Sequence, residues 1–259
     1  SGGCHISSYK RKALSFLQPR ISTLAQICTT ANLQGRSRQC CVPLPSADTA
    51  GHHEHMRVVV IGASSGTGRQ VVEQAVQRGH DVVALSRRGT GLPGITDVRG
   101  DATDPAVVGR AVGAAADAVV LAIGGSPGTD RNRAAVTAAL LEAAPPGSIG
   151  RVVVHSSLGV GDSAAHLPAP MRLLTSMVLR RALADHDEQE RLVRESGLPW
   201  TIVRPGGLTD KPATGQVLAL EGPGRFAPTI ARADVAGFIL DCLEQPGTAG
   251  HAYTLGTRA

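Results

Sequence analysis

A glycine-rich turn offers the clearest chemistry in this sequence: Gly62–Gly68 reads G-A-S-S-G-T-G. An apolar run with β-branched residues precedes it and apolar residues at helical spacing follow it, which predicts a strand, a turn and a helix. The glycines let a ligand approach the backbone, and the helix N-terminus offers N–H groups and a positive dipole end to phosphates. We therefore expect the turn to bind the diphosphate of a dinucleotide through Gly62, Ala63, Ser64, Ser65, Gly66, Thr67 and Gly68.

Two arginines at the end of the next apolar run indicate which dinucleotide binds. Arg87 and Arg88 follow Ser86, where an NAD enzyme usually has an Asp or Glu for the ribose 2′-hydroxyl. Guanidinium groups pair with a 2′-phosphate instead. The two arginines therefore predict NADP(H) as the cofactor. The alternative is that both are solvated side chains at a strand end.

Polar and small residues also stand at the ends of later predicted strands, where ligands bind in parallel α/β sheets. Asp101 can accept a hydrogen bond from the adenine amino group, and Gly124 leaves space for the nicotinamide ribose. Ser157 would lie near the nicotinamide and is the candidate catalytic residue. Ordinary turn roles for Asp101 and Ser157 are the alternatives. The expected cofactor site is completed by Ala102, Ile123, Ser156 and Pro205.

The elements that must position these residues alternate along the chain. Strands are predicted over Arg57–Ile61, Asp81–Leu85, Ile95–Arg99, Ala118–Ile123, Arg151–His155 and Trp200–Arg204, and helices over Pro105–Ala116, Asp130–Ala144 and Arg232–Leu243. Gln216–Leu220 and His251–Leu255 are shorter predicted strands. This order predicts an α/β fold: a single Rossmann-type, doubly wound parallel sheet over residues 56–259, with a small C-terminal portion on the substrate side.

Residues 1–55 differ from the rest of the chain. They hold four of the five cysteines and almost all of the net charge of +5. We expect a disordered leader, either an organelle transit peptide or an extension that is not part of the native protein. The protein is then expected in the cytoplasm, or in an organelle if this leader directs import.

The composition of residues 56–259 excludes several functions. They carry no basic stripe, which argues against a nucleic-acid partner, and no apolar run long enough to cross a membrane. Cysteines with the C-x-x-C spacing of a zinc site are missing from the sequence, so we expect no metal. Cys242 is expected to be a core residue, and a chain without a disulfide framework suits a reducing compartment.

Over about residues 56–256, the chain resembles the atypical short-chain dehydrogenase/reductase group, which includes NmrA-like proteins and flavin/biliverdin reductases. The resemblance rests on the glycine turn, on S-R-R, on G-D-A at Gly100–Ala102 and on H-S-S at His155–Ser157. The block Glu190–Leu208 is the most specific part. The resemblance implies an NAD(P)-binding Rossmann fold, and it also implies that His186, where relatives often have a Lys, touches the nicotinamide ribose. A surface histidine on a helix is the alternative.

Two departures from the resembled group bear on function. The turn has the spacing G-x-x-x-G-x-G rather than G-x-x-G-x-x-G, and Gly207 stands where flavin/biliverdin reductases have a substrate-side His. The sequence also has no Y-x-x-x-K pair, which argues against carbonyl–alcohol chemistry of the Tyr-Lys type.

Two functions remain. The first is an NADPH-dependent oxidoreductase that transfers hydride to a conjugated small-molecule acceptor such as a flavin or quinone, since such a ring needs stacking and orientation while water supplies the proton. The second is a non-enzymatic NADPH-binding sensor or regulatory protein of NmrA type. We expect a monomer or weak dimer. An apolar stripe over Met171–Leu183 predicts a helix that is either a packing face or a lid over the acceptor.

Overall fold

A computed structural model describes residues 55–124, 132–167, 169–222 and 224–258 of the chain. The expected leader therefore lies almost entirely outside the described residues, and its disorder stays a prediction. Within the described ranges, no helix has the length and apolar character that a membrane-spanning helix needs.

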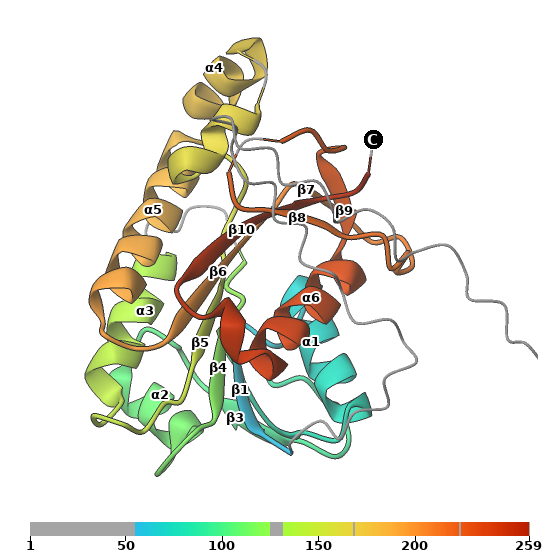
Figure 1. Ribbon diagram of the computed structural model, residues 1–259. Helices are drawn as coiled ribbons and strands as arrows, with labels where there is room; N and C mark the ends of the chain where they lie inside the picture. The colour runs from blue at the N-terminus through green and yellow to red at the C-terminus, as the bar shows by residue number, and fades with distance from the viewer. Residues whose placement is uncertain (1–54, 125–131, 168, 223, 259) are drawn as a thin grey trace, which may run out of the picture. The chain divides into compact units, whose positions relative to one another are not determined.

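One large sheet forms the centre of the fold, in the order β3-β2-β1-β4-β5-β6-β10-β8 (Figure 1). Neighbouring strands are parallel except that β8 runs antiparallel to β10. The strands are β1 Arg57–Ile61, β2 Asp81–Ser86, β3 Thr96–Arg99, β4 Ala118–Leu121, β5 Val152–His155, β6 Trp200–Pro205, β8 Leu218–Leu220 and β10 His251–Gly256. A separate pair joins β7 Gly207–Thr209 to β9 Thr229–Ala231. The predicted doubly wound α/β sheet is confirmed.

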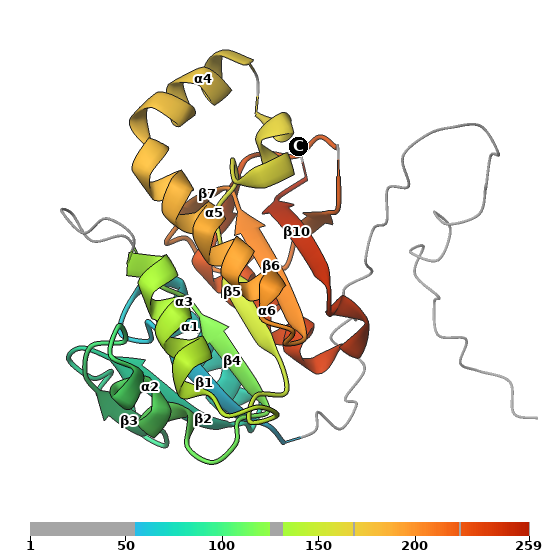
Figure 2. The ribbon, with the colours of Figure 1, turned by 90° about the vertical axis from the view of Figure 1, so that its left-hand side faces the viewer.

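Helices cover both faces of this sheet. Helices α1 and α6 pack together on one face, and α2, α3 and α5 cover the other (Figures 1 and 2). Their bounds are α1 Gly66–Gln77, α2 Pro105–Val112, α3 Asn132–Ala143, α4 Ala169–Val178, α5 Arg180–Glu195 and α6 Arg232–Glu244, with short 3-10 turns η1 Gly161–His166 and η2 Pro246–Thr248.

Strand β1 shows why the sequence folds this way. Its side chains alternate between two fully buried clusters: Val58 and Val60 face α1 and α6, whereas Val59 and Ile61 face the α2 and α3 side. A strand that is buried on both faces needs a continuous apolar run, which is what residues 58–61 supply. The core is built almost wholly from Val, Leu, Ile and Ala.

Two predicted helices differ from the observed ones. The helix expected to reach Ala116 ends at Val112, because Gly113 adopts φ 66°, while Asp104 caps its start as expected by accepting from the Ala106 N–H at 2.9 Å. The single helix expected over Met171–Leu183 is wrong: the helical backbone breaks at Leu179, which separates α4 from α5.

Candidate functional site

The predicted site residues follow the carboxyl ends of neighbouring strands, so the structure brings them to one edge of the sheet. Ile61 lies beside both Leu85 and Leu121, and the turns that follow these three positions are therefore adjacent. Strands β5 and β6 continue the same edge, with His155 beside Val203. The strand order reverses between β1 and β4, and the crevice at such a point is where parallel α/β sheets bind ligands.

The glycine turn fits a dinucleotide diphosphate. Gly66, the first residue of α1, has φ 57°, a conformation that favours glycine. A Cβ on Gly68 would stand 2.2 Å from the Gly62 carbonyl oxygen, so Gly68 is required for α1 to pack on β1. The hydroxyl of Thr67 is buried without a hydrogen-bond partner, and Ser65 makes no side-chain cap. The start of α1 thus keeps polar groups available for an anion.

Arg232 places a positive charge beside this turn. It is the first residue of α6, and its Nε lies 3.6 Å from the place a Cβ on Gly66 would occupy. Its Nη1 donates to Asp210 Oδ1 at 2.7 Å, and about a quarter of its side chain (27%) is exposed. Since α1 and α6 pack against each other, a guanidinium and the N-terminus of α1 face the same space.

The end of β2 holds the predicted 2′-phosphate residues. Arg87 and Arg88 are both exposed, and the Ser86 hydroxyl is buried without a partner. Asp101 is exposed at the end of β3 and accepts from the Thr103 N–H at 3.0 Å. This hydrogen bond, with a smaller contribution from the charge of Arg87, lowers the pKa of Asp101. A carboxylate therefore lies within reach of Arg87, although none is present in the S-R-R segment itself.

At the nicotinamide end, the two serines after β5 differ sharply. Ser156 is buried, and its hydroxyl donates to Glu190 Oε1 at 2.6 Å. Ser157 is half-buried, and its hydroxyl donates only to the Leu158 carbonyl at 3.2 Å. Across the crevice Ile123 is buried, and Gly124 has open space where a side chain would stand. Ser157 is therefore the serine whose hydroxyl can turn to a ligand.

A buried ion pair holds the Ser156 segment in place. The Arg204 guanidinium on β6 donates to both oxygens of Glu190 on α5, at 2.9 and 2.7 Å, and both side chains are 4% exposed. Arg204 also pairs with Asp162 in η1. Burial alone would disfavour its charge, but the bonds to Glu190 outweigh this and raise the pKa of Arg204. Arg204 therefore keeps its charge, and its bonds tie β5, β6, α5 and η1 together.

Two neutral histidines lie behind the same edge. His186 on α5 is 6% exposed, so the alternative of a surface histidine is wrong. Burial, followed by the charges of Arg133 and His155, lowers the pKa of His186 to about 3, and its Nδ1 is buried without a partner. Burial also lowers the pKa of His155 to about 4. Both imidazole rings are therefore uncharged near neutral pH.

Several of these residues were missed at the sequence level. Arg204 stands in the otherwise apolar run W-T-I-V-R-P, and an arginine in a buried strand needs an acidic partner, a signal that could have pointed to Glu190. Asp185, which accepts from the Arg133 and Ala134 N–H groups at 3.1 and 3.0 Å, and Arg232 gave no comparable signal.

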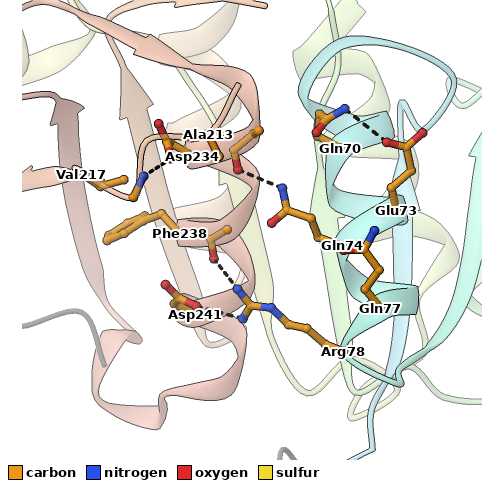
Figure 3. A pocket seen from close by; sticks show the side chains of 13 residues that line it. Gln70, Glu73, Gln74, Gln77, Arg78, Ala213, Val217, Asp234, Phe238 and Asp241 are labelled. Carbon is orange, nitrogen blue, oxygen red and sulfur yellow. Dashed lines mark hydrogen bonds and ion pairs between the residues drawn. The ribbon is translucent and has the colours of Figure 1, made fainter. Parts of the chain in front are cut away.

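A cavity of about 510 Å³ lies between α1, α6 and the segment Ala213–Val217 (Figure 3). Its charged groups have protein partners: Arg78 donates to Asp241 Oδ1 at 2.9 Å, and Asp234 accepts from the backbone N–H groups of Thr214 and Gly215. It follows the sides of the two helices, away from the sheet edge, and it contains none of the predicted cofactor residues. Over the described residues, no cluster of three or more His, Cys, Asp or Glu side chains could hold a metal.

Comparison with known proteins identifies the cofactor class. The profile of a family described as NAD(P)H-binding matches residues 62–246. A curated (4-alkanoyl-5-oxo-2,5-dihydrofuran-3-yl)methyl phosphate reductase from Streptomyces griseus subsp. griseus is 30% identical over 210 residues, which cover 76% of this chain and 67% of that protein. An uncharacterised chloroplast protein from Arabidopsis thaliana is 28% identical over 216 residues, covering 78% and 77%.

Comparison with solved structures also finds a reductase with a similar fold. ChuY, an anaerobillin reductase from Escherichia coli O157:H7, has a solved structure that superposes with a TM-score of 0.68 at 27% identity, covering 78% of this chain and 97% of that one.

Proposed function

The chain belongs to the NAD(P)H-binding family, and from this premise we propose that it is an NADPH-dependent reductase that transfers hydride to a conjugated ring such as a flavin or quinone. The observation that carries the proposal is the presence, at one sheet edge, of a glycine turn whose helix N-terminus has no side-chain cap and of a half-buried serine whose hydroxyl donates only to the carbonyl of the next residue. The two relatives above with stated activities are reductases, which supports the reaction class.

We assign the cofactor's parts to residues along this edge. The N-terminus of α1 and Arg232 would bind the diphosphate, since backbone N–H groups and a guanidinium both favour an anion. Arg87 and Arg88 would pair with the 2′-phosphate, and Asp101 would accept from the adenine. Gly124 would leave room for the nicotinamide ribose, beside Ile123 and Pro205.

Bound NADPH would supply the hydride, and the chain's own residues would orient the two rings. Ser157 would orient the nicotinamide or polarise the acceptor through its hydroxyl. Glu190 and Arg204 would act on Ser157 only indirectly, by fixing Ser156 and the turn that follows. The proton would come from water, because no Y-x-x-x-K pair exists in the sequence and both buried histidines are neutral.

The test measures the oxidation of NADPH, with menadione or FMN as the acceptor, from the change in absorbance of the nicotinamide. We expect steady turnover, and we expect Ser157→Ala to lower kcat more than it weakens NADPH binding. Ser148→Ala is the matched control, because Ser148 is a buried serine whose hydroxyl has no partner and which lies before β5, away from the site. Tight NADPH binding without oxidation by any acceptor would favour the sensor function instead.

A further inference from the structure

Four large apolar side chains are exposed within seven residues of the chain, on α4 and directly after it. Leu173, Met177, Val178 and Leu179 are 64%, 72%, 70% and 46% exposed. In the rest of the described chain, only Val76 is a large apolar side chain with comparable exposure, at 36%. Leu173 and Met177 are one helical turn apart and so share a face of α4. Apolar side chains gathered in this way mark an interaction surface.

The charged residues nearest to these side chains in the sequence are all basic. Arg172, Arg180 and Arg181 are exposed beside them, and the sequence has no Asp or Glu from Ser163 to Ala184. The acids at the two ends of this stretch are engaged elsewhere: Asp162 pairs with Arg204, and Asp185 pairs with Arg133 at the start of α3. We call the exposed set the α4 patch; it comprises Arg172, Leu173, Met177, Val178, Leu179, Arg180 and Arg181.

We propose that the α4 patch docks on an anionic lipid surface, with its apolar side chains at the boundary between headgroups and acyl chains and its arginines on the phosphates. A helix with exposed apolar side chains beside arginines has the composition of an interfacial helix. Anionic lipid supplies charge that is complementary to the exposed arginines Arg172 and Arg180. A second copy of the chain fits less well, because a twofold interface would set arginines against arginines.

The position of α4 allows such docking. It packs against α5 and projects past the carboxyl end of the sheet in both ribbon views (Figures 1 and 2). Helix α4 therefore lies at the periphery of the fold, where a flat surface can approach it (Figures 1 and 2). This inference goes beyond the proposed reductase activity and does not depend on it.

Co-flotation of the full chain with lipid vesicles tests the proposal. We expect flotation with vesicles that contain phosphatidylglycerol, little with phosphatidylcholine alone, and a decrease as salt is added. Met177→Asp should lower partitioning at least about tenfold, through lost apolar burial and added like charge. Removing one arginine, as in Arg180→Ala, should lower it roughly fivefold. Val76→Asp is the matched control, since it adds an acid at an exposed apolar position outside the patch.

The other possible results of these experiments would contradict lipid docking, and two of them would assign another role to the α4 patch. No flotation with either lipid, or equal flotation of Met177→Asp and the unmutated chain, would overturn the proposal. A concentration-dependent dimer in sedimentation that Met177→Asp abolishes would assign the patch to a second copy. A higher KM for the acceptor in Met177→Asp, without lipid binding, would make α4 a lid. NADPH binding by Met177→Asp should stay unchanged, which separates failure here from failure of the proposed function.

Discussion

The glycine turn at Gly62–Gly68 and the serine turn at Ser156–Leu158 lie at the same edge of the sheet but are held in opposite ways. The glycine turn is shaped by backbone, and the hydroxyl of Thr67 within it has no partner. The serine turn is held by buried side chains, with Ser156 bound to Glu190 and Glu190 bound to Arg204. We infer that the first is built to receive a ligand and the second to stay rigid beside it.

Substitutions in the two turns should therefore affect different properties of the protein. A change at Gly66 should affect cofactor binding more than folding, because a Cβ there would come near only the Arg232 side chain. A change in the Glu190–Arg204 pair should affect folding first, because removing one partner leaves a buried charge whose remaining ion-pair partner is partly or largely exposed. The predictions below separate the two effects.

The largest expected effect is on folding. Glu190→Ala should lower the free energy of unfolding by about 3 kcal/mol, because it leaves the buried Arg204 with only the exposed Asp162 as an acidic partner. Glu195→Ala, which removes an exposed partner of Arg191 on the same helix, should cost no more than about 1 kcal/mol. Denaturant unfolding of both variants measures the contrast, and equal losses would contradict the assigned role of the buried pair.

A substitution in the glycine turn should reduce cofactor binding more than it reduces folding stability. Gly66→Val should weaken NADPH binding at least about a hundredfold, because a β-branched residue disfavours φ 57° and its side chain would meet Arg232 beside the phosphate site. Folding should suffer less than in Glu190→Ala. Isothermal titration calorimetry together with thermal unfolding checks both, and near-normal binding would mean that the diphosphate lies elsewhere.

We expect His155 and His186, which lie near the serine turn, to make the free energy of unfolding sensitive to acid. His155 and His186 have pKa values lowered by burial to about 4 and about 3, so the unfolded chain binds their protons more readily than the folded chain. Their contribution to stability is present above the unfolded pKa near 6.5 and is lost as pH falls below it. The expected loss between pH 6.5 and pH 5 is about 1.5 kcal/mol for each histidine.

A variant isolates this pH dependence. His186→Asn should flatten the fall of unfolding free energy between pH 6.5 and pH 5, whatever it does to stability at neutral pH. Charges of Arg133 and Arg232 face this pair of rings and persist in the variant. An unchanged slope would show that other groups cause the acid sensitivity.

The smallest expected effects distinguish two arginines. Arg87→Ala should weaken NADPH roughly tenfold and leave NADH almost unchanged, since only NADPH carries the 2′-phosphate. Arg232→Gln should weaken both cofactors alike, since both carry the diphosphate. The Arg87 effect should shrink with salt because its side chain is exposed. Equal dissociation constants for NADPH and NADH in the unmutated chain at low salt would end the assignment of Arg87.

Local patterns predicted much of the fold. The bounds of β1, Arg57–Ile61, matched the apolar run, and Asp104 caps α2 as its residue type predicts. Such features depend on neighbours in sequence and on one-residue preferences. The alternation of helices with buried runs predicted the doubly wound parallel sheet in the same way, whereas the order of its strands came from the structure.

Partners that are distant in sequence could not be predicted in this way. Nothing near Arg204 shows that its carboxylate comes from Glu190, or that Arg232 reaches Gly66, because only the folded chain brings these residues together. The sequence did not predict the break at Leu179 because the apolar period continues beyond this residue. Met177 and Val178 are exposed, so packing of these side chains against the core does not align α4 with α5. Long-range pairing and solvent exposure are properties of the folded chain rather than of a sequence window.

The most direct test of the central claim follows the hydride itself. NADPH labelled with deuterium at the transferable position of the nicotinamide is incubated with the protein and menadione under anaerobic conditions. Because the deuteron on a quinol oxygen exchanges with water, the acceptor panel should include an activated alkene, whose carbon keeps the label in the product seen by mass spectrometry. We expect deuterium in that product and oxidised cofactor in equal amount. Bound NADPH that stays reduced with menadione, with FMN and with the alkene, or an alkene product that forms without the label, would contradict the proposed hydride transfer.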